Sequence, residues 1–189
     1  TPSDSSAASD VYKRQVLACP AMPVENNQPG MLYVAVRGEG AAMMPIAGGE
    51  LTPIQVVQAG DTAHLRFVES VESSHGDQDR QNAVAKAVGI TAASVRVDSQ
   101  AKYGIVASGQ AALYLRLPSP KSPNYRENIW DHAAGAIVVE EAGGRVSDIR
   151  GKPLNFADGA KMLDNRGVVV SNKIIHEQVL SILQQFQLE

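Results

Sequence analysis

The chain has 189 residues, of which 44% are hydrophobic and 20% charged, as in globular proteins of one or two domains. A formal net charge of −3 gives no reason to expect non-specific binding to nucleic acid or anionic membranes, and no apolar run approaches the roughly 20 residues that span a bilayer. The single cysteine, Cys19, excludes an intrachain disulfide framework and fits a reducing compartment, so we expect the cytoplasm.

Predicted strands and helices alternate along most of the chain. Residues 1–15 are rich in Ser, Ala and Asp and lack periodicity, so we expect a disordered tail there. Apolar runs and alternation predict strands at 16–20, 31–36, 64–68, 94–97, 111–117, Val146 and 168–171. Helical spacing predicts helices at 77–88, 99–108, 131–142 and 174–186. Glycine and proline place a hairpin turn at 37–41, a loop with a short strand at 45–62 and a loop at 118–125. This alternation favours an α/β fold with a largely parallel sheet.

The most informative stretch begins at Asn128 and reads N-I-W-D-H-A-A-G, and the apolar helix after it ends in E-A-G-G at 141–144. Asp131 stands where a helix N-cap stands, beside free backbone N–H groups and the positive end of the helix dipole. A carboxylate held there stays ionised and keeps a fixed direction, as a ligand of a hard metal ion must. A plain helix cap is the simpler interpretation of its position, and only the surrounding string favours a metal ligand.

These strings resemble the motifs of a known family. The W-D-x-A-A-G and E-A-G-G pair is similar to the signature of the inositol-monophosphatase-like, magnesium-dependent phosphatases. Within that group, V-D-S-Q-A-K-Y-G at 97–104 and L-Y-L-R-L-P at 113–118 resemble the 3'(2'),5'-bisphosphate nucleotidases, as does V-E-S-S-H at 71–75. The resemblance runs from about Val16 to about Leu183.

The resemblance implies a layered α/β/α/β/α sandwich, with Mg²⁺ as cofactor and Asp131 as one of its ligands. It also implies that the substrate contacts His75, Ser99, Lys102, Arg116 and Asp131. The expected reaction removes the 3'-phosphate of 3'-phosphoadenosine 5'-phosphate to give AMP and phosphate, and extends to the phosphosulfate analogue in sulfur assimilation. The expected enzyme is a monomer that acts on a small molecule, with no nucleic-acid or membrane partner. An inositol mono- or polyphosphate phosphatase and a non-catalytic nucleotide-binding fragment remain the alternatives.

Three of these residues suit a substrate with two phosphate groups and around four negative charges. Ser99 is predicted to cap the following helix, whose first amide groups would then face an anion. Lys102 lies on the same face of the first turn and adds a point charge, and Arg116 can bind phosphate through two parallel N–H groups. Singly, each is equally well a surface or strand-edge charge, so the prediction depends on the whole set within these strings.

Two motifs of the same family are missing. Neither a G-E-E string nor D-P-[IL]-D-G-T, which carry the other metal ligands, occurs in the chain. We therefore expect a C-terminal portion of an enzyme: 1–15 as a tail outside the family, 16–66 as the remnant of an N-terminal metal-binding domain, and 67–189 as a C-terminal α/β domain. Because one carboxylate cannot hold magnesium, this fragment is expected to be inactive alone. A lost N-terminus would also carry any targeting segment, which leaves an organelle open beside the cytoplasm.

Two further features concern charge. Asn128 stands where related sequences often carry lysine, which lowers the positive charge expected near Asp131. Four charged residues follow the predicted helix, and we expect them to form a solvated loop: Arg145, Asp148, Arg150 and Lys152. Neither feature adds a ligand to the predicted site.

Overall fold

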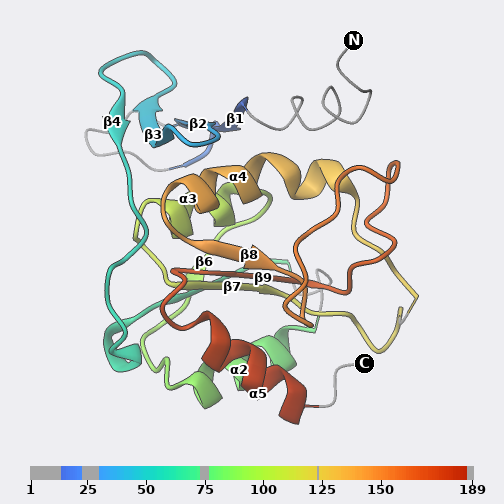
Figure 1. Ribbon diagram of the computed structural model, residues 1–189. Helices are drawn as coiled ribbons and strands as arrows, with labels where there is room; N and C mark the ends of the chain where they lie inside the picture. Colours follow the sequence, from blue (N-terminus) through green and yellow to red (C-terminus); the bar gives the residue numbers. More distant parts are fainter. Residues whose placement is uncertain (1–13, 23–29, 73–76, 123, 187–189) are drawn as a thin grey trace.

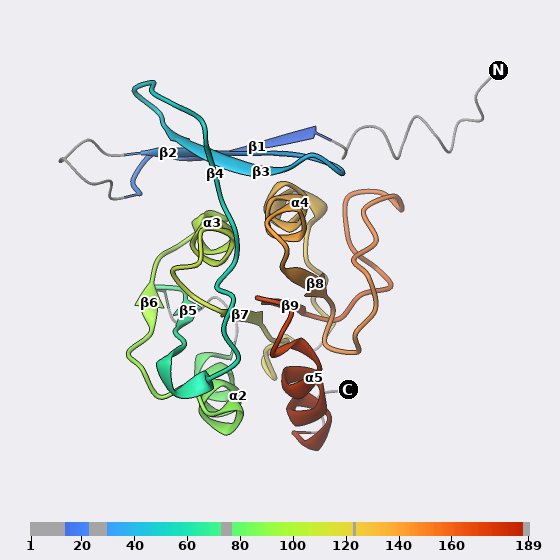
Figure 2. The same cartoon turned by 60° about the vertical axis from the view of Figure 1, so that its left-hand side comes forward.

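The computed structural model describes residues 14–22, 30–72, 77–122 and 124–186, and these form two β-sheets and two pairs of α-helices. The four-stranded sheet lies over α3 (Ala101–Ala107) and α4 (Ala133–Glu141), and the five-stranded sheet separates this pair from α2 (Gln78–Val88) and α5 (His176–Gln185) (Figures 1 and 2). The predicted α/β fold is confirmed. The outermost helical layer of the expected five-layer sandwich has no counterpart among these residues. None of the described helices has the length and apolar character needed to cross a membrane.

The four-stranded sheet is antiparallel throughout. Its order is β1 (Arg14–Cys19), β2 (Met31–Val36), β3 (Gly40–Pro45) and β4 (Thr52–Pro53). The bounds of β2 match the prediction. Alternate residues of this apolar run, Met31, Tyr33 and Ala35, are buried on the face toward the helices. β1 begins before the predicted strand, so Arg14 and Gln15 belong to the sheet rather than to the predicted tail. The remainder of that tail, residues 1–13, lies outside the described chain.

A pair of carboxylates ties α4 to the hairpin between β2 and β3. The backbone N–H groups of Gly38 and Gly40 donate to Oε2 of Glu141 over 3.0 and 3.1 Å. Beside them, Nη1 of Arg37 lies 2.6 Å from Oε2 of Glu140. The glycine-rich turn and the E-A-G-G string lie about 100 residues apart in the sequence. Their contact fixes the four-stranded sheet on α4.

The five-stranded sheet is mixed, with the order β6-β5-β7-β9-β8. Its strands are β5 (Phe67–Glu69), β6 (Val95–Arg96), β7 (Leu113–Arg116), β8 (Arg145–Ser147) and β9 (Val168–Ser171). β5 pairs in parallel with β6 and β7, whereas β9 runs antiparallel to both β7 and β8. The prediction of a largely parallel sheet is therefore wrong for β9. No described helix lies between β8 and β9 in the chain, so β9 returns beside β8 in the opposite direction.

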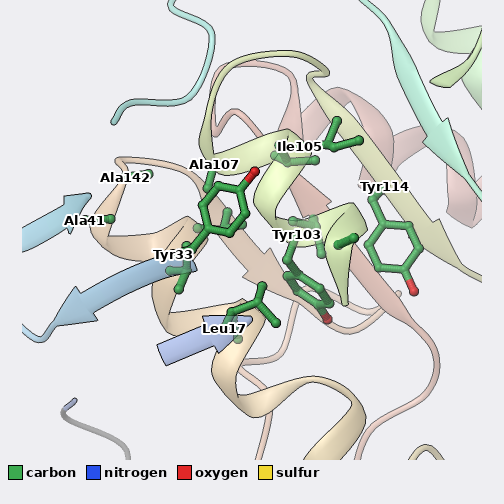
Figure 3. Packing of buried hydrophobic residues seen from close by; sticks show 14 of the residues in the cluster. Leu17, Tyr33, Ala41, Tyr103, Ile105, Ala107, Tyr114 and Ala142 are labelled. Carbon is green, nitrogen blue, oxygen red and sulfur yellow. The ribbon is translucent and has the colours of Figure 1, made fainter. Parts of the chain in front are cut away.

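Three tyrosine side chains lie in the core around α3, one from the four-stranded sheet, one from α3 itself and one from the five-stranded sheet (Figure 3). A Cβ atom built on Gly135 of α4 would overlap the ring of Tyr103 of α3, and one on Gly104 would overlap the ring of Tyr33 of β2. Both glycines are thus required by close packing of a ring against a helix backbone. Tyr103 also meets Tyr114 of β7 edge to face, with ring centroids 5.4 Å apart. This stack joins both sheets to α3.

Asp148 corrects one expectation, because it is fully buried and not part of a solvated loop. Its Oδ1 accepts from the backbone N–H groups of Arg150 and Lys152, each over 2.9 Å, and its Oδ2 accepts from that of Arg166 over 3.3 Å. A charged residue is buried when it satisfies several donors at once. Asp148 therefore organises the long segment between β8 and β9.

His176 docks the start of α5 onto β8 and β9. The residue is 0% exposed, and its Nδ1 and Nε2 lie 2.8 and 2.9 Å from the hydroxyl oxygens of Ser171 and Ser147. The Ser147 hydroxyl donates to the carbonyl oxygen of Asp148, so it accepts from Nε2–H of a neutral imidazole. Burial, with a smaller contribution from Arg145, lowers the pKa of His176 from 6.5 to about 4, and Glu177 opposes this shift.

We expect this histidine to make folding sensitive to mild acid. Because its pKa is lower in the folded state, the unfolded chain takes up a proton first as the pH falls below about 6.5. The contribution of His176 is full above that pH and should decline by about 2 kcal/mol between pH 7 and pH 5. Urea unfolding at both pH values, compared with His176→Gln, measures it. An identical pH dependence in the two proteins would contradict the prediction.

Candidate phosphate-binding site

A cavity of about 1140 Å³ lies where the beginnings of α2 and α3 meet the end of β7 and the segment after it. Four of the five predicted substrate contacts line this cavity: Ser99, Lys102, Arg116 and Asp131. They come from three segments that are separate in the sequence, before and within α3, on β7 and before α4. The fifth, His75, lies outside the described residues.

The predicted helix cap at Ser99 is wrong. Ser99 has a φ of 59°, α3 begins at Ala101, and the residue at the cap position, Gln100, makes no side-chain cap hydrogen bond. A capping side chain needs the extended backbone of an N-cap residue, which Ser99 does not adopt. The seven-residue helix therefore gives no support for an anion site at its N-terminus. Ser99 still lies at the cavity, as an exposed hydroxyl.

The predicted cap at Asp131 is also wrong. Ile129–Asp131 form a 3-10 turn, and α4 begins at Ala133 with His132 at the cap position. The side chain of Gln100 replaces the expected cap: its Oε1 accepts from Gly135 N–H over 2.9 Å, and its Nε2 donates to the Trp130 carbonyl over 2.7 Å. The sequence missed this contact because Gln100 is 35 residues away. Asp131 is left exposed at the cavity.

Asp131 has one carboxylate oxygen in a hydrogen bond. Nδ2 of Asn128 donates to its Oδ2 over 2.9 Å. The amide at position 128 thus orients the carboxylate without placing a full positive charge beside it. This is consistent with a role as metal ligand, since an adjacent cation would compete with a metal ion.

Lys102 points an almost buried ammonium group at the cavity. The residue is 4% exposed, Nζ lies 3.5 Å from the carbonyl oxygen of Val97, and the centre of the Tyr114 ring is 5.4 Å away. Burial lowers the pKa of Lys102 to about 8, Asp98 opposes the shift and Arg116 adds to it. Among the described residues no carboxylate forms an ion pair with Lys102, so an anionic ligand can become the direct partner of this ammonium group.

Arg116 begins a hydrogen-bonded chain that the sequence analysis missed. Its Nε donates to Oε1 of Glu127 over 3.1 Å, Oε2 of Glu127 lies 3.3 Å from Nε2 of His132, and Nδ1 of His132 lies 2.7 Å from the Tyr103 hydroxyl. Burial opposes ionisation of Glu127, but the hydrogen bond to His132 and the charge of Arg116 outweigh it and lower its pKa. No periodicity or motif marked Glu127, which lies in a loop.

The described residues do not by themselves form a magnesium site. No group of three or more His, Cys, Asp or Glu side chains in the described ranges could hold a metal ion, and Asp131 offers one ligand. The cavity lining carries three cations against four carboxylates: Lys102, Arg116 and Lys121 against Asp77, Asp79, Glu127 and Asp131. A ligand with several negative charges therefore needs further positive charge from outside this part of the chain.

Comparison with known proteins supports the resemblance found in the sequence. Residues 11–188 match the model of the inositol monophosphatase family. The chain is 39% identical over 187 residues to the 3'(2'),5'-bisphosphate nucleotidase of Emericella nidulans, covering 89% of this chain and 53% of that protein. It is 41% identical over 171 residues to the enzyme of that name from Schizosaccharomyces pombe, covering 87% and 48%. The chain thus spans about half the length of these curated relatives.

Solved structures agree on the fold. The inositol monophosphatase of Anabaena superposes with a TM-score of 0.58 at 22% identity, covering 82% of this chain and 57% of the other. SuhB of Mycobacterium tuberculosis gives a TM-score of 0.57 at 21% identity, covering 84% and 55%. At these identities the likeness concerns the fold alone. With the family match over nearly all of the chain, it leads to one conclusion: the chain belongs to the inositol monophosphatase family.

Proposed function

We propose that this chain is the substrate-binding, C-terminal portion of a 3'(2'),5'-bisphosphate nucleotidase. The observation that carries the proposal is the meeting of Ser99, Lys102, Arg116 and Asp131 at one cavity. The names of the relatives at 39% and 41% identity support the same substrate class. The complete enzyme would hydrolyse the 3'-phosphate of 3'-phosphoadenosine 5'-phosphate, and the phosphosulfate analogue, in sulfur assimilation.

In this proposal two cations bind one phosphate group each. The half-buried Arg116 offers a planar guanidinium and the buried Lys102 a point charge, from different elements that line the same cavity. Asp131 would supply one ligand to Mg²⁺, which neutralises phosphate charge and activates water when it is bound. Since the described residues offer no other ligand set, we expect this chain alone not to hydrolyse the nucleotide.

The organisation of the complete enzyme is part of the proposal. Residues 67–189 would form its C-terminal domain and residues 16–66 the end of an N-terminal metal-binding domain. We further propose that the complete enzyme is a monomer and that it acts in the cytoplasm. Its single cysteine, Cys19, is buried and free, which fits a reducing compartment.

Replacing Lys102 with Met tests the substrate class. Met keeps the volume of the buried stem and removes the charge, so the fold should survive. In the complete enzyme, kcat/KM for 3'-phosphoadenosine 5'-phosphate should fall about 10- to 100-fold, the loss expected for one charged hydrogen bond. Turnover of inositol monophosphate should change less than about 3-fold. The matched control is Lys152→Met, an exposed lysine outside the cavity.

Two results would reject the assignment. Equal losses on both substrates would make Lys102 a structural residue. A wild-type enzyme that hydrolyses inositol monophosphate and leaves the bisphosphate nucleotide untouched would favour the inositol phosphatase alternative.

A further inference from the structure

We propose that Glu127 is a positioning residue that fixes the guanidinium group of Arg116 for phosphate binding in the cavity. This inference rests on the proposed function. Glu127 engages Nε of Arg116 over 3.1 Å, and this hydrogen bond does not use the two terminal nitrogens. Arg116 is a long side chain with several rotamers, and an unheld guanidinium would lose rotamer entropy on binding. A fixed one presents its donors in advance.

Glu127 can fix Arg116 because the buried side chain of His132 holds Glu127 in turn. Oε2 of Glu127 lies 3.3 Å from Nε2 of His132, and because a carboxylate can only accept, Nε2–H is the donor. Nδ1 of the same imidazole lies 2.7 Å from the buried Tyr103 hydroxyl, which fixes the orientation of the ring. Both carboxylate oxygens of Glu127 therefore accept hydrogen bonds. His132 and Tyr103, the last two residues of this hydrogen-bonded series, are only 2% and 1% exposed and are therefore packed in the core.

The backbone of Glu127 is fixed as well. Its carbonyl oxygen accepts from Met162 N–H over 3.0 Å, and the neighbouring Ile129 N–H donates to the Ala160 carbonyl over 3.1 Å. The segment before Asp131 is thus paired with the segment between β8 and β9. Both the main chain and the side chain of Glu127 are therefore restrained, and Glu127 in turn restrains Arg116.

The direction in which KM changes when the Glu127 carboxylate is removed distinguishes positioning of Arg116 from simple charge balance. Glu127 offsets part of the positive charge of Arg116. If this were its only effect, removing the carboxylate would strengthen attraction to phosphate and lower the KM for the nucleotide. If Glu127 positions Arg116, its removal raises KM although the cavity becomes more positive. The two roles therefore predict opposite changes.

The experiment is a double-mutant cycle in the complete enzyme with 3'-phosphoadenosine 5'-phosphate as substrate. Glu127→Ala should raise KM about 10-fold and change kcat less than about 3-fold. A loss of this size is typical when a residue that orients a substrate-binding side chain is removed. In the Arg116→Ala background the same change should leave KM unaltered. Asp164→Ala, an exposed carboxylate on the nearby segment, is the control. Thermal unfolding of every variant reports on the fold.

Two conservative variants keep the test decisive if Glu127→Ala does not fold. Glu127→Gln retains an acceptor of the same reach and should restore KM to within about 3-fold of the wild type. Glu127→Asp keeps the charge but is one carbon shorter, and should raise KM. A lowered or unchanged KM in Glu127→Ala, or an equal effect without Arg116, would overturn the proposal; if Glu127→Ala does not fold, a lowered or unchanged KM in Glu127→Asp would overturn it.

Calorimetry separates this inference from the proposed function. Binding of the nucleotide is measured without divalent metal, so turnover is not needed. If the wild type binds but does not hydrolyse the nucleotide, the nucleotidase assignment fails, and the Kd values of the same variants still decide the role of Glu127. A wild type that neither binds nor hydrolyses it would overturn both.

Discussion

Replacing Asp131 with Asn is expected to lower the turnover of the complete enzyme by more than about 100-fold while leaving its free energy of unfolding nearly unchanged. The amide has the same shape as the carboxylate but lacks the negative charge that a hard cation requires. Asp131 is exposed, and its hydrogen bond comes from Asn128, to which an amide oxygen can equally accept. The substitution therefore removes charge without removing a structural contact.

The measurement is kcat as a function of magnesium concentration, together with urea unfolding in the absence of divalent ions. Raising magnesium should recover only part of the lost turnover. Asn128→Ala is an informative partner variant, because it frees the carboxylate and keeps its charge, and should cost far less activity than Asp131→Asn. Full magnesium-dependent turnover by Asp131→Asn would show that Asp131 is not a metal ligand.

Local patterns predicted the regular elements well where the sequence itself contains the whole signal. A continuous apolar run gave β2 its bounds, and α2 runs from Gln78 to Val88 and ends before Gly89, whose φ is 97°. Asp77, where the predicted helix begins, is the N-cap of α2 and accepts from the Arg80 N–H. Strands, helices and the α/β fold follow from such short-range information.

The same rules failed where a distant residue supplies the contact. Asp131 and Ser99 both have the residue type of a cap, but Gln100 reaches across to α4 and the chain at Ser99 turns into the left-handed region. Glu127 carries no local signal, because its partner Arg116 is 11 residues away on β7. A linear string can thus name Lys102, Arg116 and Asp131 as a set, but it cannot show which neighbours orient them. Tertiary contacts override local preference at these positions.

Asp148→Ala is expected to lower the free energy of unfolding by about 3 kcal/mol, the largest stability effect that we predict. The fully buried carboxylate accepts from the backbone N–H groups of Arg150, Lys152 and Arg166, and all three lose their acceptor together. Water can reach only part of this space, so much of the desolvation cost remains. Asp148→Asn keeps one oxygen acceptor and should lose about half as much.

Activity should fall with stability in this variant, because the segment that Asp148 organises supports the site. Residues 160–162 of that segment pair with the backbone at 127–129, directly before Asp131. When the segment loosens, Glu127 and Asp131 lose their main-chain restraint, so KM for the nucleotide should rise even at temperatures where the protein stays folded. Urea unfolding and limited proteolysis of residues 150–166 measure the structural part. Asp164→Ala, an exposed carboxylate in the same segment, should change stability by less than about 0.5 kcal/mol. If Asp148→Ala behaves like Asp164→Ala, the buried carboxylate does not organise this segment, and the support it gives to Asp131 must come from elsewhere.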